Sequence, residues 1–215
     1  MSGPALALCE PRARLGLKGP RAAEWLAARG IALPAEPNTW RYSAETSTQA
    51  LAETSAETSA PDALLVARLG TGEFFLEDSA AGSTVTRIAP ALDGQPPGVY
   101  PVLREDWAFR LGGEGVHDAL AQVCNVNFSA LALDSNPVIM TLMIGVAVLV
   151  VPQSASRYRG VPAEDGGTAV GGGTAETMAH RRYRIWCDPT FGPYLGESLG
   201  VVVIECGGSY KGVSG

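Results

Sequence analysis

The first clear pattern of apolar and polar positions lies between residues 13 and 33. Apolar side chains alternate with glycine or lysine from residue 15 to residue 18, which is the period of two expected of a strand. Gly19 and Pro20 follow and mark a turn. Beyond them, one stripe of a predicted helix consists of Ala22, Trp25, Leu26 and Arg29. Gly30 suits the position just after that helix, because glycine readily takes the left-handed conformation that ends helices.

Further apolar runs in the first half of the chain predict strands. Two runs on either side of Gly70-Thr71-Gly72 predict a β-hairpin over Ala63–Asp78. The following loop region contains one short apolar run, and a short strand is expected near Val85–Ile88. A second ordered block is expected over Val99–Leu131.

The second half continues with a long apolar run over Val138–Val151, rich in β-branched residues. It predicts a single strand buried on both faces. A membrane-spanning helix needs about 20 apolar residues, so the run is too short to cross a bilayer. The chain then ends with a predicted strand, a turn at Pro189, a short helix around Tyr194–Leu199 and a last strand over Val201–Cys206.

Two low-complexity segments interrupt this pattern, over residues 43–60 and 160–179. The first repeats the letters AETS at Ala44, Ala52 and Ala56, and the second contains GGTAVGGG. Neither composition can bury a core, so both are predicted to be loop insertions.

An internal repeat relates the two halves of the chain. LGLKGPRAAEWLAARGIAL, which begins at residue 15, aligns with AFRLGGEGVHDALAQVCNV, which begins at residue 108, when residues 94 positions apart are paired: Leu17 with Leu111, Gly19 with Gly113, Leu26 with Leu120 and Ala27 with Ala121. Each copy is a strand, a glycine turn and a helix. The chain is therefore expected to be an α+β protein with mixed or antiparallel sheets. It is expected to form a single globular unit of two similar halves, about 1–98 and 99–215.

The glycine turn at residue 19 has the layout of a phosphate site at a helix N-terminus, with Lys18 and Arg21 beside it. A turn that occurs twice is more simply a folding element, since a phosphate loop would occur once. Neither copy matches the phosphate-loop pattern, and GGEGVHD lacks the last glycine of the dinucleotide fingerprint. We therefore predict that Gly19 and Gly113 turn a strand into its covering helix.

Composition disfavours several classes of partner and binding site. The net charge is −6, which disfavours nucleic acid as the main partner. The four cysteines form no C-x-x-C pair, only two histidines are present, and no metal-ligand spacing appears. Four reduced, mostly buried thiols in a cytosolic protein are expected. No signal peptide is visible, so no membrane association and a cytoplasmic location are expected.

Three candidate chemical groups remain, and none completes a catalytic set. His117 corresponds to Ala23 in the other copy, and we expect it on the solvent side of its helix. Cys187, in the sequence WCDP, suggests a reactive thiol, although a strand end with Asp188 capping a turn is the favoured interpretation. Glu105 and Asp106 would point to opposite faces of a strand, so they are poor partners in acid–base chemistry. No catalytic or metal-binding residue is assigned, and cofactor-binding residues are left unknown.

The repeat resembles the folate-binding domain of the aminomethyltransferase family, and within it the gamma subunits of heterotetrameric sarcosine oxidases. The stretches that carry this resemblance are LGLKGPRAAEWLAARGIALPAEPNTW, VARLGTGEFFLED, REDWAFRLGGEGVHDALAQVCNVN, MTLMIGVAVLVVP and YRIWCDPTFGPYLGESL. They cover most of the chain outside the two insertions, which depart from the family. The signature K-G-C-Y-x-G-Q-E of one branch is absent, and Cys124 lies in AQVCNVNF instead.

The resemblance implies a non-catalytic accessory subunit of a sarcosine-oxidase-like complex linked to one-carbon metabolism. Such a chain would not be catalytic alone. It would bind the other subunits, and flavin and NAD would be held only by those partners. Tetrahydrofolate as a ligand of this chain stays open. The alternative hypothesis is a stand-alone folate-binding protein similar to an aminomethyltransferase, and a third is an orphan module with an unrelated partner.

Overall fold

The computed structural model describes residues 3–43, 63–153 and 181–212, and the strands among them form two sheets. Both predicted insertions lie outside the described residues, except for Ser43. The chain divides into two compact units. The first contains the residues up to Pro11 and the described residues from Glu105 onward, and the second contains the described residues of Arg12–Arg104. The expected α+β class is confirmed.

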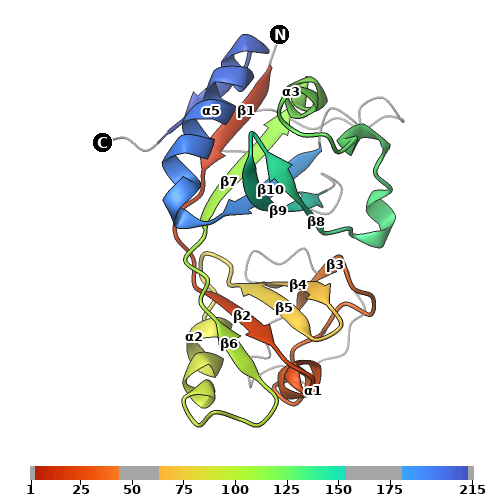
Figure 1. The fold of residues 1–215 in the computed structure, drawn as a ribbon, viewed down its shortest axis with the longest axis vertical. Helices are drawn as coiled ribbons and strands as arrows, with labels where there is room; N and C mark the ends of the chain where they lie inside the picture. The colour runs from red at the N-terminus through yellow and green to blue at the C-terminus, as the bar shows by residue number, and fades with distance from the viewer. Residues whose placement is uncertain (1–2, 44–62, 154–180, 213–215) are drawn as a thin grey trace. The chain divides into compact units, whose positions relative to one another are not determined.

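The first unit contains a six-stranded sheet with the strand order β11-β1-β7-β10-β9-β8. Its strands pair antiparallel except β1 with β11, which are parallel. Helices α3 and α5 cover one face of this sheet (Figure 1). Its elements are β1 (Pro4–Leu8), β7 (Trp107–Gly113), α3 (Val116–Val123), η2 (Phe128–Ala130), η3 (Leu133–Ser135), β8 (Ile139–Met143), β9 (Val146–Gln153), β10 (Arg182–Cys187), η5 (Pro189–Phe191), α5 (Gly192–Glu205) and β11 (Ser209–Lys211).

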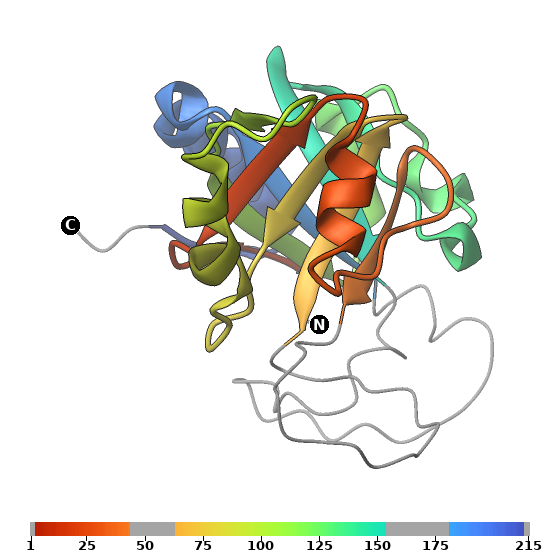
Figure 2. The ribbon, with the colours of Figure 1, turned by 90° about the horizontal axis from the view of Figure 1, so that it is seen from below.

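The second unit contains a five-stranded antiparallel sheet with the strand order β3-β4-β5-β2-β6. Helices α1 and α2 lie on one face of it (Figure 2), and their buried side chains pack with those of the strands. Strands β4 and β5 form the predicted hairpin around residues 70–72. The elements are β2 (Arg14–Lys18), α1 (Ala22–Ala27), β3 (Thr39–Ser43), β4 (Leu64–Gly70), β5 (Glu73–Glu77), α2 (Thr84–Ile88), η1 (Ala89–Leu92) and β6 (Tyr100–Val102).

The first strand of each half pairs in the sheet of the other half. Strand β1 pairs with β7, and β6, which immediately precedes β7 in the chain, pairs with β2. The chain therefore passes from the first unit to the second at Arg12 and returns to the first unit at Glu105. The expected division into 1–98 and 99–215 is corrected accordingly. Hydrophobic spacing reveals that a strand forms, but it does not reveal which distant strand completes its hydrogen bonds.

The two repeated turns have matching geometry. Each leads from a strand, β2 or β7, through a glycine with positive φ into a helix, with φ 129° at Gly19 and 100° at Gly113. The paired leucines are buried in both copies: Leu17, Leu26, Leu111 and Leu120. The structure thus agrees with the predicted strand–turn–helix repeat. The helix stop at Gly30 is also confirmed, because its φ is 74° and its N–H donates to the carbonyl of Ala27 at 2.9 Å.

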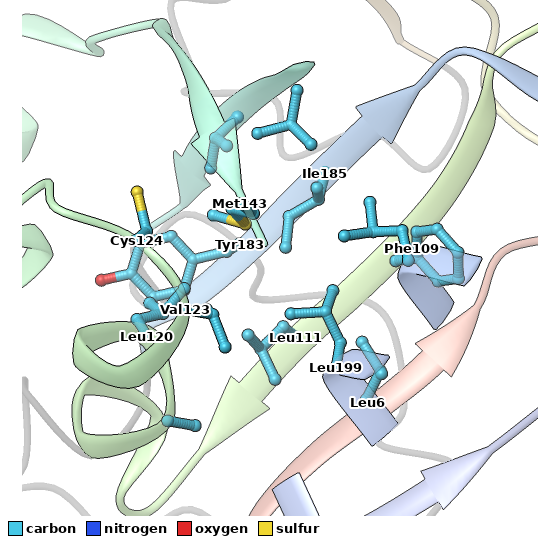
Figure 3. Close-up of a cluster of buried hydrophobic side chains, with 14 of the residues drawn as sticks. Leu6, Phe109, Leu111, Leu120, Val123, Cys124, Met143, Tyr183, Ile185 and Leu199 are labelled. Atoms are coloured by element: carbon cyan, nitrogen blue, oxygen red, sulfur yellow. The ribbon is translucent and has the colours of Figure 1, made fainter. Parts of the chain in front are cut away.

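The core of the first unit forms between its sheet and its two helices (Figure 3). Tyr183 and Ile185 of β10 meet Leu111 and Phe109 of β7 in register. Side chains from α3 and α5 pack onto them, including Leu120, Val123 and Leu199. Because these side chains are almost fully buried, they hold both helices against the same face of the sheet.

Helix α5 approaches the sheet closely along a line of three glycines, Gly192, Gly196 and Gly200. A Cβ atom at Gly196 would lie 2.9 Å from a ring carbon of Phe109, and one at Gly200 would lie 2.5 Å from a ring carbon of Tyr210. A Cβ atom at Gly192 would collide with the ring of Trp107. The missing side chains therefore make room for aromatic rings between the helix and the sheet.

Three predicted elements were wrong. Residues Val85–Ile88 belong to the helix α2 and not to a strand. The carboxylate of Asp78, seven positions earlier in the chain, accepts from the N–H of Val85 at 3.0 Å and so caps the first turn of this helix. Residues Val201–Cys206 continue α5 as a helix up to Glu205. The run Val138–Val151 is not one strand but the hairpin of β8 and β9, although β9 is buried on both faces from Val148 onward.

Candidate functional site

The first glycine turn uses up its backbone donors within the protein. The N–H of Gly19 donates to the carbonyl of Gly72 at 2.9 Å, and the N–H of Arg21 donates to the carbonyl of Gly98 at 3.0 Å. The N–H of Ala22 donates to the carbonyl of Gly19 at 3.2 Å, and Pro20 has no N–H. A phosphate loop needs these donors free to point at the anion. The N–H groups of the turn at Gly19 are therefore bound by carbonyls of the protein itself and do not point at an anion.

An open depression of about 420 Å³ lies beside this turn and is lined by residues 18–20 and 70–73. Its two charged groups, Lys18 and Glu73, form an exposed ion pair at 3.7 Å. Arg21 lies outside it and pairs with Glu24 on α1 at 3.4 Å, again in solvent. A carboxylate beside each cation opposes the binding of a second anion, so the depression offers little to a phosphate.

The second glycine turn places a polar pair beside α3. The Nε2 atom of His117 shares a hydrogen bond of 2.7 Å with the hydroxyl of Tyr183 on β10. The two rings are arranged edge to face with their centroids 6.0 Å apart, and Phe128 packs edge-on against Tyr183 at 5.2 Å. His117 was expected on the solvent side of its helix, but it is half-buried and partnered. Its partner is 66 positions away in the chain, so no local pattern shows it.

Burial favours the neutral form of both groups in this pair. Burial lowers the pKa of His117, and the nearby guanidinium of Arg181 lowers it further, while Asp118 raises it. Burial raises the pKa of Tyr183, against the opposing effect of Arg181. A neutral imidazole and an un-ionised phenol that bond each other hold the end of α3 against β10. We assign this pair a positioning role in the fold.

Cys187 lies at the buried end of β10. Its side chain is buried, and burial, together with the carboxylates of Asp106 and Asp188, raises the pKa of its thiol to about 11. The predicted cap is confirmed, because Asp188 accepts from the hydroxyl of Thr190 and also from its N–H, at 2.8 Å, and these hydrogen bonds lower the pKa of Asp188. The four cysteines are unbridged thiols; Cys124 and Cys187 are buried, and Cys9 and Cys206 are half-buried.

Glu105 and Asp106 lie in the link between β6 and β7 and not on a strand. Glu105 is exposed, whereas Asp106 is half-buried, so the two carboxylates occupy different surroundings. Within residues 3–43, 63–153 and 181–212, no cluster of three His, Cys, Asp or Glu side chains could hold a metal ion. The helices that the structure describes are all too short or too polar to cross a membrane.

Comparison with known proteins identifies the fold. No family model matches the sequence, and no curated protein matches it significantly. The structure is similar to a chain of the heterotetrameric sarcosine oxidase from Corynebacterium sp. U-96, solved in complex with pyrrole 2-carboxylate. That likeness has a TM-score of 0.59 at 18% identity and covers 96% of this chain and 87% of that one.

It is also similar to the glycine cleavage system aminomethyltransferase T from Bartonella henselae, with a TM-score of 0.55 at 16% identity. This match covers 92% of the chain but 45% of the aminomethyltransferase, so the chain spans less than half of that protein's length. The chain therefore has the fold shared by these two proteins.

Proposed function

We propose that the chain is a non-catalytic accessory subunit of a sarcosine-oxidase-like flavoenzyme complex that works in the cytoplasm. The single observation that carries the proposal is the extent of the structural match. It covers nearly all of this chain and most of one chain of a heterotetrameric sarcosine oxidase, whereas the aminomethyltransferase contains a further half with no counterpart here.

The chemistry of the described residues supports this proposal. The backbone donors of the first turn are used within the fold, and the thiol of Cys187 is protonated. The hydrogen bond between His117 and Tyr183 joins helix α3 to strand β10. The proposal therefore assigns flavin and NAD to partner subunits, and the chemistry that they supply, oxidation of an N-methyl amine, to those subunits as well.

The test is purification of the tagged full-length chain from cells of its own species, followed by gel filtration. We expect a yellow complex in which the chain is stoichiometric with larger flavoprotein subunits and which oxidises sarcosine. The same chain purified alone should be colourless and inactive. Flavin that remains with the isolated chain after gel filtration would contradict the proposal.

A stand-alone folate-binding protein is the alternative that the likeness to aminomethyltransferase T favours. It differs from the first proposal in a measurable way. The isolated chain would then bind tetrahydrofolate saturably in a calorimetric titration, and it would elute from gel filtration without partners when taken from its own cells.

A further inference from the structure

Helix α5 presents apolar side chains on the surface opposite its core. Tyr194, Val201 and Ile204 are 52%, 56% and 59% exposed. Together with Glu197 they are spaced by three and four residues, which places all four on one stripe of the helix. We call these four residues the α5 outer stripe.

Within the fold, the hydroxyl of Tyr194 donates to the carbonyl of Ile144 at 3.5 Å, and Val201 and Ile204 form the exposed apolar remainder of the stripe. The opposite side of α5 buries Leu195, Leu199 and Val203 in the core, and the glycine line seats the helix on aromatic rings of β7 and β11. Exposed apolar side chains that gather on one surface mark a site that binds another protein more often than single exposed apolar residues do. The outer stripe is therefore expected to be covered when the protein is in its working assembly.

Charge distinguishes between two occupants of the outer stripe. Glu197 lies within the stripe and Glu205 next to its end, and the sequence of α5, GPYLGESLGVVVIE, contains no basic residue. Pairing of two α5 helices from two copies of the chain would bury Glu197 with no cation from either helix, which is costly. A different protein with a basic residue at this place satisfies both the apolar contacts and the charge.

We propose that the α5 outer stripe binds an apolar helix face of a partner subunit that carries a lysine or arginine opposite Glu197. The inference rests on the proposed function, because it takes the partner to be a subunit of the flavoprotein complex. The spacing of the stripe suits a helix laid along it, since apolar anchors three and four residues apart on one helix fit the grooves of another.

The test uses the tagged full-length chain expressed in cells of its own species. Val201→Arg and Ile204→Arg should each lower the amount of co-purified flavoprotein at least tenfold. Leu142→Arg on β8 is the matched control, because Leu142 is also apolar and 59% exposed, and it should stay within twofold of the wild type. Circular dichroism of each isolated variant should show the same melting temperature, since all three side chains are at the surface.

The outcomes separate the inference from the function on which it rests. Normal recovery of flavoprotein with Ile204→Arg would overturn the assignment to α5 and leave the proposed function standing. Equal loss with Leu142→Arg would show a general effect of a new surface arginine and would also overturn it. Absence of flavoprotein with the wild-type chain would overturn the proposed function and this inference with it.

The nature of the partner is tested at Glu197 and Val201. Glu197→Arg should lower recovery of the flavoprotein more than Glu197→Gln, because only the former repels a cation. A photoreactive phenylalanine at position 201 should cross-link to a partner segment that contains lysine or arginine. A cross-link between two copies of this chain would overturn the choice of partner.

Discussion

The turn at Gly19 and the turn at Gly113 carry the chain from a buried strand into a helix that covers the same sheet, but their surroundings differ. Beside the first lie exposed ion pairs, and its backbone donors are bound by Gly72 and Gly98. Beside the second, His117 reaches Tyr183. The residue that corresponds to His117 in the first copy is Ala23. The two copies therefore share the backbone path and the buried leucines, but they differ in the polar side chains beside the turn.

The largest effect is expected at the equivalent leucines. Leu26→Ala and Leu120→Ala each remove a fully buried side chain from beneath a helix, and each should lower the free energy of unfolding by about 2–5 kcal/mol. Chemical denaturation of the full-length variants measures this. Leu103→Ala is the control, because Leu103 is 80% exposed, and the change should stay within about 0.5 kcal/mol. A stable Leu120→Ala would break the equivalence of the two turns.

A smaller loss is expected at the glycines. Gly19→Ala and Gly113→Ala place a side chain at positive φ, which costs about 1–3 kcal/mol. The loss should be greater at Gly19, because the new Cβ atom would collide with the carbonyl oxygen of Gly98, whereas at Gly113 it would lie 2.9 Å from that of Gly3.

Denaturation midpoints compare the two glycine variants with Gly94→Ala. At Gly94 no atom lies within 4 Å of the new Cβ, so that substitution should be tolerated. A larger loss of stability with Gly113→Ala than with Gly19→Ala would contradict the prediction that the turn at Gly19 is the more crowded of the two.

Local spacing explains why the repeated turns could be predicted from the sequence. The alternation of apolar and polar residues before Gly19 and the apolar stripe of the helix after it each show, within a few residues, which side chains are buried. Because the strand and the helix both form by burying those side chains, the pattern predicts both elements. The hairpin around residues 70–72 was predictable for the same reason, since its turn is rich in glycine.

The missed elements depend on tertiary contacts. Val201, Val202 and Val203 favour a strand by propensity, but Gly196 and Gly200 let α5 pack onto aromatic rings, and that packing outweighs propensity. The turn between β8 and β9 was concealed because Ile144 takes a φ of 50°, which β-branched residues rarely adopt.

The contact between His117 and Tyr183 was the least predictable feature of the candidate site. The pairing of His117 with Tyr183 joins a helix to a strand that is far away in the sequence, and no periodicity encodes such a contact. The sequence did predict that β10 ends at Cys187 and that Asp188 caps the following turn, because a strand end followed by Asp188 and Pro189 is a common turn pattern.

A weaker effect, dependent on pH, should distinguish the second turn from the first. Because the pKa of His117 in the folded protein lies below its ordinary value of 6.5, the unfolded chain binds more protons as the pH falls below that value. The folded state should therefore lose stability on acidification through this range. His117→Gln should remove this part of the loss, measured as the difference in urea midpoint between about pH 7.5 and about pH 5.5.

Asp118→Asn sharpens the same measurement. The carboxylate of Asp118 raises the pKa of His117, so its removal should lower that pKa further and deepen the loss on acidification. If the wild type and His117→Gln lost the same stability on acidification, the lowered pKa of His117 in the folded protein would be contradicted.

The smallest effect on stability is expected at the charged side chains of the first turn. Lys18 and Arg21 form exposed ion pairs with Glu73 and Glu24 at 3.7 Å and 3.4 Å. Such pairs contribute little, so Lys18→Ala and Arg21→Ala should change the free energy of unfolding by no more than about 0.5 kcal/mol. A calorimetric titration with inorganic phosphate should detect no saturable binding to the wild type or to either variant. A phosphate site would give the reverse pattern, with binding to the wild type that Lys18→Ala abolishes. That pattern requires free N–H groups at the turn, and the carbonyls of Gly72 and Gly98 already accept from Gly19 and Arg21.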